Sequence, residues 1–197
     1  MNLKFELTSE IKVLFGITLH RIKAVKSFGN VEQGELGGWV EKESNIDMSG
    51  NAWVYGNAQV SGNARVSGDA QVYGDAWVSG DAQVSGNARV YGDAWVYGDA
   101  QVSGNARVSG DAWVYGDEWK KSPLYIQGTK YAVCMHNATK LKIGCQIHTI
   151  SQWLRHGEKI AQAENFTAEE IEEYRAYVEL AAKRYGVKES ESEDLSR

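Results

Sequence analysis

The middle of the chain repeats one pattern of apolar and polar positions every six residues. Valine occupies every sixth position over residues 54–114, alanine over residues 52–112 and glycine over residues 50–116. Twelve such hexads run without interruption over residues 48–119. Because neighbouring side chains along a strand point to opposite faces, the alanine and valine of each hexad share one face. A fixed period of this kind predicts a solenoid, in which each unit relies on its neighbours to bury that face.

Glycine followed by asparagine or aspartate separates each short strand from the next. Glycine adopts a positive φ freely and asparagine or aspartate adopts it at low cost, so the pair predicts a corner. A ladder of metal ligands is the alternative interpretation of the asparagine and aspartate positions. They lack the nonapeptide calcium signature GGxGxDxUx, and we expect corners and no metal site.

The outward positions indicate how many hexads make one coil. The residue before valine cycles through Trp, Gln and Arg over positions 77–113, and Tyr55, Tyr73 and Tyr91 recur at the same interval of three hexads. Three strands and three corners describe a triangular prism, and four coils at the spacing of about 4.8 Å make a rod about 19 Å long. These repeats resemble the hexapeptide-repeat family, although glycine stands one place later than usual. The resemblance implies a mainly β fold, a left-handed parallel β-helix.

The prism presents three different outward faces. The tryptophan face carries Gln59, Ser61, Trp77, Ser79, Trp95, Tyr97, Trp113 and Tyr115. The tyrosine-arginine face carries Trp53, Tyr55, Gln71, Tyr73, Arg89, Tyr91, Arg107 and Ser109. The polar face carries Arg65, Ser67, Gln83, Ser85, Gln101 and Ser103.

The two aromatic faces are too apolar for a soluble monomer. Each aromatic side chain offers roughly 150 to 250 Å², and monomers rarely expose more than a few hundred Å² of contiguous apolar surface. Two unlike adhesive faces on a prism suit a heterologous contact that closes by threefold rotation, so we expect a homotrimer. The expected interface consists of Trp77, Trp95, Trp113, Tyr97, Tyr115, Trp53, Tyr55, Tyr73 and Tyr91.

Part of this surface could instead bind a small anion. In this interpretation Arg89 or Arg107 pairs with a phosphate or carboxylate, while Tyr91 and Trp95 stack on a flat group in a cleft between protomers. Simple packing between protomers is the competing explanation of the same residues.

The flanking segments predict three further regions. Residues 1–45 alternate like strands and form an N-terminal cap, and residues 46–119 form the β-helix. Residues 120–187 form a small α+β domain, with three apolar runs as a three-stranded sheet and two helices that begin at the capping boxes of Thr149 and Thr167. Residues 188–197 are polar and charged, which predicts a disordered tail.

Composition narrows the class of protein. The net charge of -5 argues against non-specific binding of nucleic acid. No segment is apolar enough to span a membrane, and the charged N-terminal segment does not resemble a signal peptide, so we expect a cytoplasmic protein of a bacterial host cell. Cys134 and Cys145 show no metal or disulfide spacing, which favours reduced thiols.

Three function classes remain. Many relatives of this repeat are acyltransferases that use acetyl-coenzyme A and a histidine base, but His20, His136, His148 and His156 all lie outside the hexads. We therefore expect no catalytic residue and no cofactor. The N-terminal segment resembles one in uncharacterised phage and prophage proteins, which implies a counter-defence accessory factor that blocks a host protein or sequesters a small anionic signal. A structural segment of a virion is the third class.

Overall fold

The computed structural model describes residues 3–187 and contains two compact units, which divide between Pro123 and Leu124. The predicted tail, residues 188–197, lies outside the described residues. No helix in the described part of the chain is long and apolar enough to cross a lipid bilayer.

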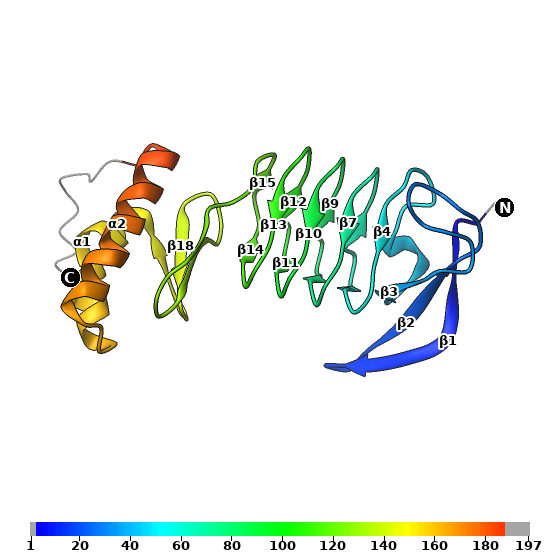
Figure 1. The fold of residues 1–197 in the computed structure, drawn as a ribbon, viewed down its shortest axis with the longest axis horizontal. Helices are drawn as coiled ribbons and strands as arrows, with labels where there is room; N and C mark the ends of the chain where they lie inside the picture. The colour runs from blue at the N-terminus through cyan, green and yellow to red at the C-terminus, as the bar shows by residue number, and fades with distance from the viewer. Residues whose placement is uncertain (1–2, 188–197) are drawn as a thin grey trace. The chain divides into compact units, whose positions relative to one another are not determined.

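The first unit contains the predicted coils, which stack as about four turns of a β-solenoid (Figure 1). The hexads form β4 (Trp53–Val54), β5 (Gln59–Val60), β6 (Arg65–Val66), β7 (Gln71–Val72), β8 (Trp77–Val78), β9 (Gln83–Val84), β10 (Arg89–Val90), β11 (Trp95–Tyr97), β12 (Gln101–Val102), β13 (Arg107–Val108), β14 (Trp113–Tyr115) and β15 (Glu118–Trp119). Every third strand pairs in parallel, in the orders β5-β8-β11-β14, β4-β7-β10-β13 and β6-β9-β12-β15. These three stacks are the tryptophan, tyrosine-arginine and polar faces, so the predicted period is confirmed.

Alanine and valine fill the interior of the prism, as predicted. Their side chains are at most 1% exposed along the whole run of hexads. At the corners only the glycine takes a positive φ, except in the last hexad, where Asp117 also has a φ of 60°. Gly80 shows why: its φ is 69°, and an added Cβ would lie 3.0 Å from the backbone nitrogen of Gly98 in the next coil.

The coil path begins before the first hexad. The N-terminal region forms β1 (Phe5–Leu14), β2 (Ile17–Ala24), β3 (Leu36–Val40) and the 3-10 helix η1 (Glu43–Asn45). Strand β3 pairs in parallel with β5, and Ile46 bridges to Val66. The β1–β2 hairpin therefore extends the tryptophan face into one seven-stranded sheet.

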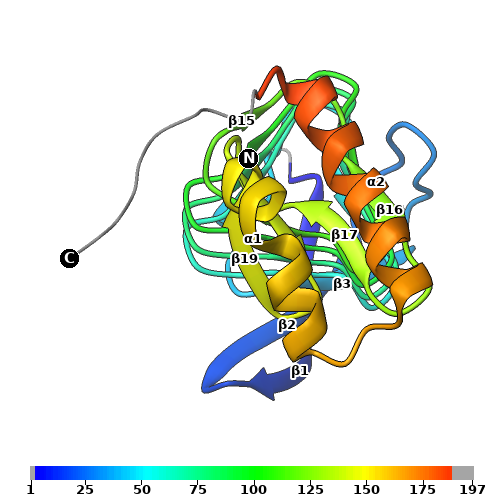
Figure 2. The same cartoon turned by 90° about the vertical axis from the view of Figure 1, so that its left-hand side faces the viewer.

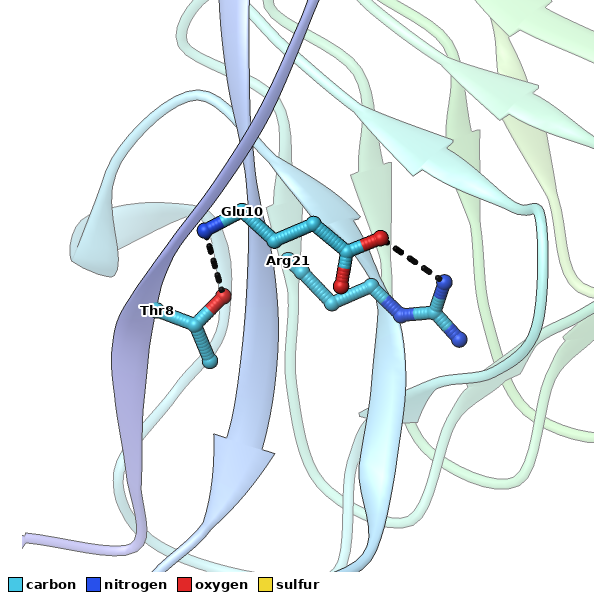
Figure 3. A network of polar contacts seen from close by, with 3 residues as sticks. All are labelled: Thr8, Glu10 and Arg21. Atoms are coloured by element: carbon cyan, nitrogen blue, oxygen red, sulfur yellow. Dashed lines mark hydrogen bonds and ion pairs between the residues drawn. The ribbon is translucent and has the colours of Figure 1, made fainter.

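A bulge bends the β1–β2 hairpin, which we call the flap (residues 5–24). The pairing register shifts between Leu7 and Ile11. Within the bulge, the Glu10 amide donates to Thr8 Oγ1 over 3.2 Å, and the Glu10 carboxylate lies 3.8 Å from Arg21 on β2 (Figure 3). In Figure 1 the flap leaves the stacked coils at an angle, which is the expected effect of a bulge on strand direction.

A lysine and two phenylalanines close the start of the solenoid. The buried Lys4 ammonium donates to the backbone oxygens of Asp47 and Ala52. Phe5 and Phe28 pack edge-on against Trp53, with ring centroids 6.0 and 5.3 Å away. Burial lowers the pKa of Lys4 to about 8, an effect that the nearby Asp47 charge partly opposes.

The lowered pKa of Lys4 predicts a pH dependence of stability. Between about pH 8 and 10.5 the unfolded chain keeps the Lys4 proton while the folded protein has lost it, so unfolding takes up a proton. Folded stability therefore rises with pH in this window. The difference in free energy of unfolding between the wild type and Lys4→Met, followed by urea titration, should change in favour of the wild type from pH 8 to 10.5. A constant difference would show that Lys4 titrates like an exposed lysine.

The second unit is a four-stranded antiparallel sheet with two helices. It consists of β16 (Tyr125–Gln127), β17 (Ala132–Met135), β18 (Lys140–Ile143), β19 (Gln146–Thr149), α1 (Ile150–Ala163) and α2 (Ala168–Tyr185). Figure 2 shows the helices in front of β17 and β19. The prediction of three strands was wrong, because Gly144, with a φ of 58°, turns the third apolar run back on itself. Both predicted capping boxes are confirmed, at Thr149 and Thr167.

Candidate functional site

The three tryptophans of the tryptophan face form a ladder. Trp77 pairs in register with Trp95, and Trp95 pairs with Trp113. The rings of Trp77 and Trp95 stack with centroids 5.1 Å apart and planes within 5° of each other. Two of the indole N–H groups donate to a serine hydroxyl of the preceding coil, that of Trp77 to Ser61 and that of Trp95 to Ser79. This hydrogen bond fixes the tilt of the ring and so allows the stack.

The ladder changes geometry at its last member. Trp113 meets Trp95 edge to face, at an angle of 79°. Sixteen residues before Trp113 stands Tyr97, at the position that Ser61 holds relative to Trp77 and Ser79 holds relative to Trp95. A tyrosine side chain cannot offer a hydroxyl at the short reach of serine, so the orientation of the two earlier indoles is not repeated.

The flap covers the start of the ladder. Phe15, at the tip of the flap, stacks on Trp77 with centroids 5.7 Å apart and planes within 6°. Behind the tip, Lys12 Nζ and Arg21 Cζ lie 4.5 and 5.2 Å from the centre of the Trp39 ring, which are distances for cation–π contacts. Burial, together with the nearby Arg21 charge, lowers the pKa of Lys12.

Three apolar side chains of the flap are exposed. The exposed fractions are 55% for Ile11, 65% for Val13 and 82% for Phe15. Phe15 and Gly16 form the two-residue turn, with φ values of 50° and 79°. Both positive φ values identify a type I′ turn, in which asparagine is favoured at the first position and a bulky residue is strained. The sequence carried this signal in the pair Phe-Gly between two apolar runs, and our prediction missed it.

Three stretches of the chain, residues 58–74, 82–98 and 100–116, match the protein family described as YdcK beta solenoid repeat. The hexads are a β-solenoid repeat. Each matched stretch spans three consecutive strands, which is one full coil: β5 to β7, β9 to β11 and β12 to β14. No curated protein matches the chain.

One predicted member of the interface does not belong to the solenoid surface. Trp53 points outward from its coil but is fully buried, because Phe5 and Phe28 of the same chain cover it. Its predicted role in contacts between protomers is therefore wrong, and it belongs to the closure of the N-terminal end. The prediction followed the period of the repeat and could not include a cover contributed from 25 and 48 residues away.

The tyrosine-arginine face of the solenoid repeat carries two adjacent columns. In one column the rings of Tyr73 and Tyr91 stack with centroids 4.9 Å apart and planes within 4°. In the other column Arg89 pairs in register with Arg107 on the neighbouring strand. Tyr55 begins the tyrosine column, and burial raises the pKa of its hydroxyl.

The four residues of the predicted ligand site lie on two faces of one protomer. Trp95 lies on a different face from Arg89, Tyr91 and Arg107, and its ring is already stacked against Trp77 on one side and met by Trp113 on the other. A ligand that contacts all four residues would therefore require two protomers. The four-residue site between protomers stays a prediction, and within one protomer only the three residues of the tyrosine-arginine face lie together.

The candidate histidines remain apart from the coils. His20 lies on β2 of the flap, while His136, His148 and His156 belong to the second unit. His148 packs edge-on against Trp153, with centroids 5.1 Å apart. Within residues 3–187 no group of three or more histidine, cysteine or acidic side chains is arranged to hold a metal ion.

Proposed function

We propose that the protein is a non-enzymatic binding protein that assembles into a homotrimer through the outer surface of its seven-stranded sheet. The observation that carries this proposal is the exposed Phe15 ring at the tip of the flap, which stacks on Trp77 at the start of the tryptophan ladder. Trp113 and Tyr115 at the far end of the same sheet are 36% and 44% exposed. Aromatic side chains are therefore exposed at both ends of the ladder, and such a surface is typical of a contact with another protein.

The strained turn supports the same assignment. Phe15 adopts a left-handed backbone although asparagine would do so at lower cost, and most of its ring is exposed. Strain of this kind is retained where a function requires the side chain. An aromatic ring at the tip of a hairpin is suited to enter a pocket of another protomer, where aromatic residues often dominate the binding energy.

A trimer closed by threefold rotation would account for the different chemistry of the two aromatic faces. The tryptophan face and the tyrosine-arginine face share one corner of the prism but differ in chemistry, so a contact between them is heterologous. Such a contact repeated by threefold rotation closes after three protomers and leaves the polar face in solvent. The trimer then presents three copies of the second unit, which raises avidity for a multivalent target.

The resemblance to phage and prophage proteins favours an accessory role during infection. In this role the trimer blocks a host protein or sequesters a small anionic signal. The role during infection and the bound host protein or signal are both part of this proposal.

Native mass spectrometry of tryptophan-ladder variants tests the assembly. The wild type should be a trimer, and replacing Trp77, Trp95 and Trp113 together by serine should release monomers. Replacing Gln83 and Gln101 by serine is the matched control on the polar face and should leave the trimer intact. A monomeric wild type, or a trimer that survives loss of the ladder, would contradict the proposal.

Phe15→Asn tests the interface without removing a ladder residue. The change loses a ring stack worth about 0.5 to 1.5 kcal/mol. It also relieves turn strain of about 1 kcal/mol, so the thermal midpoint of the protein should change little. The trimer should nevertheless weaken by at least about 30-fold, the effect of losing an interface anchor, as measured by sedimentation over a dilution series. Unchanged dissociation would show that Phe15 does not contact another protomer.

A further inference from the structure

The tyrosine column of the tyrosine-arginine face ends where Tyr91 is followed by Ser109 in the next coil, and we call this change from a ring to a small side chain the step. Tyr73 and Tyr91 stack in adjacent coils, but in the next coil Ser109 takes the position at which a ring would continue the stack. Strands β10 and β13 pair in register here, so Ser109 lies directly beside Tyr91. Within residues 3–187, the ring of Tyr91 contacts no aromatic ring except that of Tyr73. One side of Tyr91 thus faces a small hydroxymethyl group.

Two positive charges flank this step. Arg89 and Arg107 lie on neighbouring strands, about 4.8 Å apart along the stack, and both are exposed. In the part of the chain that the structure describes, neither guanidinium has an ion pair or a hydrogen bond. Like charges directly opposite each other on a sheet repel. An anion that accepts hydrogen bonds from both guanidiniums would remove this repulsion.

The two columns are separated along the strand by two residues, Arg107 to Ser109, or about 6.6 Å of extended chain. A ligand that fits both columns therefore has a flat ring at one end and an anionic group a few bonds away. A nucleoside monophosphate has this arrangement, because a ribose separates its base from its phosphate. An aromatic carboxylate does not, because its charge is attached directly to the ring.

We propose that the step at Ser109 binds a nucleoside monophosphate, with the base stacked on Tyr91 in continuation of the tyrosine column and the phosphate held by Arg89 and Arg107. The site rests on the proposed binding function and names its ligand class. Neither of the other two faces combines a column of aromatic rings that ends at a small residue with two neighbouring arginines. The polar face, for example, has one arginine, Arg65, beside a column of serines. In a trimer closed by the two aromatic faces, the step lies at the contact with the tryptophan face of a neighbouring protomer.

Isothermal titration of the full-length protein with adenosine 5′-monophosphate tests the site. The nucleotide should bind, and adenosine alone, inorganic phosphate alone and anthranilate should each bind at least about 10-fold more weakly. Ser109→Tyr places a ring where the base would stack and should reduce binding by at least about 30-fold. Arg107→Gln and Arg89→Gln should each reduce it about 10- to 100-fold through loss of a charge-assisted hydrogen bond.

Matched changes on the polar face provide the controls. Ser103→Tyr and Arg65→Gln should leave the affinity unchanged. Absence of binding at millimolar nucleotide, equal affinity for phosphate alone, or equal losses in the control variants would overturn the site. Native mass spectrometry of the same samples separates the two proposals: a trimer that binds no nucleotide overturns the ligand site alone. A monomer that binds nucleotide overturns the trimer alone.

Discussion

Gly80→Val is expected to lower the free energy of unfolding of the solenoid by at least about 3 kcal/mol. The left-handed backbone at Gly80, with a φ of 69°, costs a residue with a Cβ about 1 to 2 kcal/mol, and more for a β-branched side chain. The added Cβ would also lie 3.0 Å from the nitrogen and 3.3 Å from the oxygen of Gly98. Those are backbone atoms held by the coil ladder, so the coils must separate locally to admit the side chain.

Gly116→Val separates strain from the steric clash. Gly116 has nearly the same backbone, with a φ of 61°, but a Cβ there meets nothing within 4 Å. This variant should lose only the strain energy, which is at least about 1 to 2 kcal/mol for valine, and should therefore be less destabilised than Gly80→Val. Urea unfolding followed by circular dichroism compares the two variants. Equal losses would mean that the coils adjust to the side chain at Gly80 without cost.

The solenoid could be predicted from the sequence because its rule is local and repeated. Alternation within a strand decides that a residue such as Val96 faces inward, and the interval of three hexads decides that Trp95 lies beside Trp77 and Trp113. Neither step requires knowledge of distant contacts. The observed pairing of Trp77, Trp95 and Trp113 in successive coils follows from that arithmetic.

The failures arose where a contact comes from outside the repeat. Trp53 occupies an outward position by the same arithmetic, yet Phe5 and Phe28 bury it. The flap could not be placed over the tryptophan face, because the bulge at residues 8–10 that redirects it depends on a hydrogen bond between Thr8 and Glu10.

The candidate site shows the same division. The columns of Arg89 and Arg107, and of Tyr73 and Tyr91, were predicted to share one face and do so. The orientation of rings was not predictable from the period alone. The stack of Trp95 on Trp77 accompanies hydrogen bonds to serine hydroxyls sixteen residues earlier, and it occupies one face of the Trp95 ring. A search for serine at that spacing would have found the signal.

Tyr174→Phe is expected to destabilise the second unit by about 2 to 4 kcal/mol. The Tyr174 hydroxyl on α2 accepts hydrogen bonds from the backbone amides of Lys130 and Tyr131 and donates to the Tyr131 carbonyl oxygen over 2.7 Å. Tyr174 is 4% exposed, so water cannot readily replace its hydroxyl. Phenylalanine keeps the ring but leaves three backbone groups without this partner, at about 1 to 3 kcal/mol for each group that stays buried.

Tyr177→Phe is the matched control on the same helix. The Tyr177 hydroxyl makes one hydrogen bond, to Glu173, and its removal should cost less than about 1 kcal/mol because water reaches this partly exposed group.

Hydrogen exchange locates the effect, since the amides of Lys130 and Tyr131 should exchange faster in Tyr174→Phe and at the wild-type rate in Tyr177→Phe. Retained protection of both amides in Tyr174→Phe would show that the loop at residues 128–131 is held by other contacts. Lys130 provides one such contact, because its ammonium binds the carbonyl oxygens of Glu164 and Asn165 at the end of α1, so partial protection should persist until that lysine is also replaced.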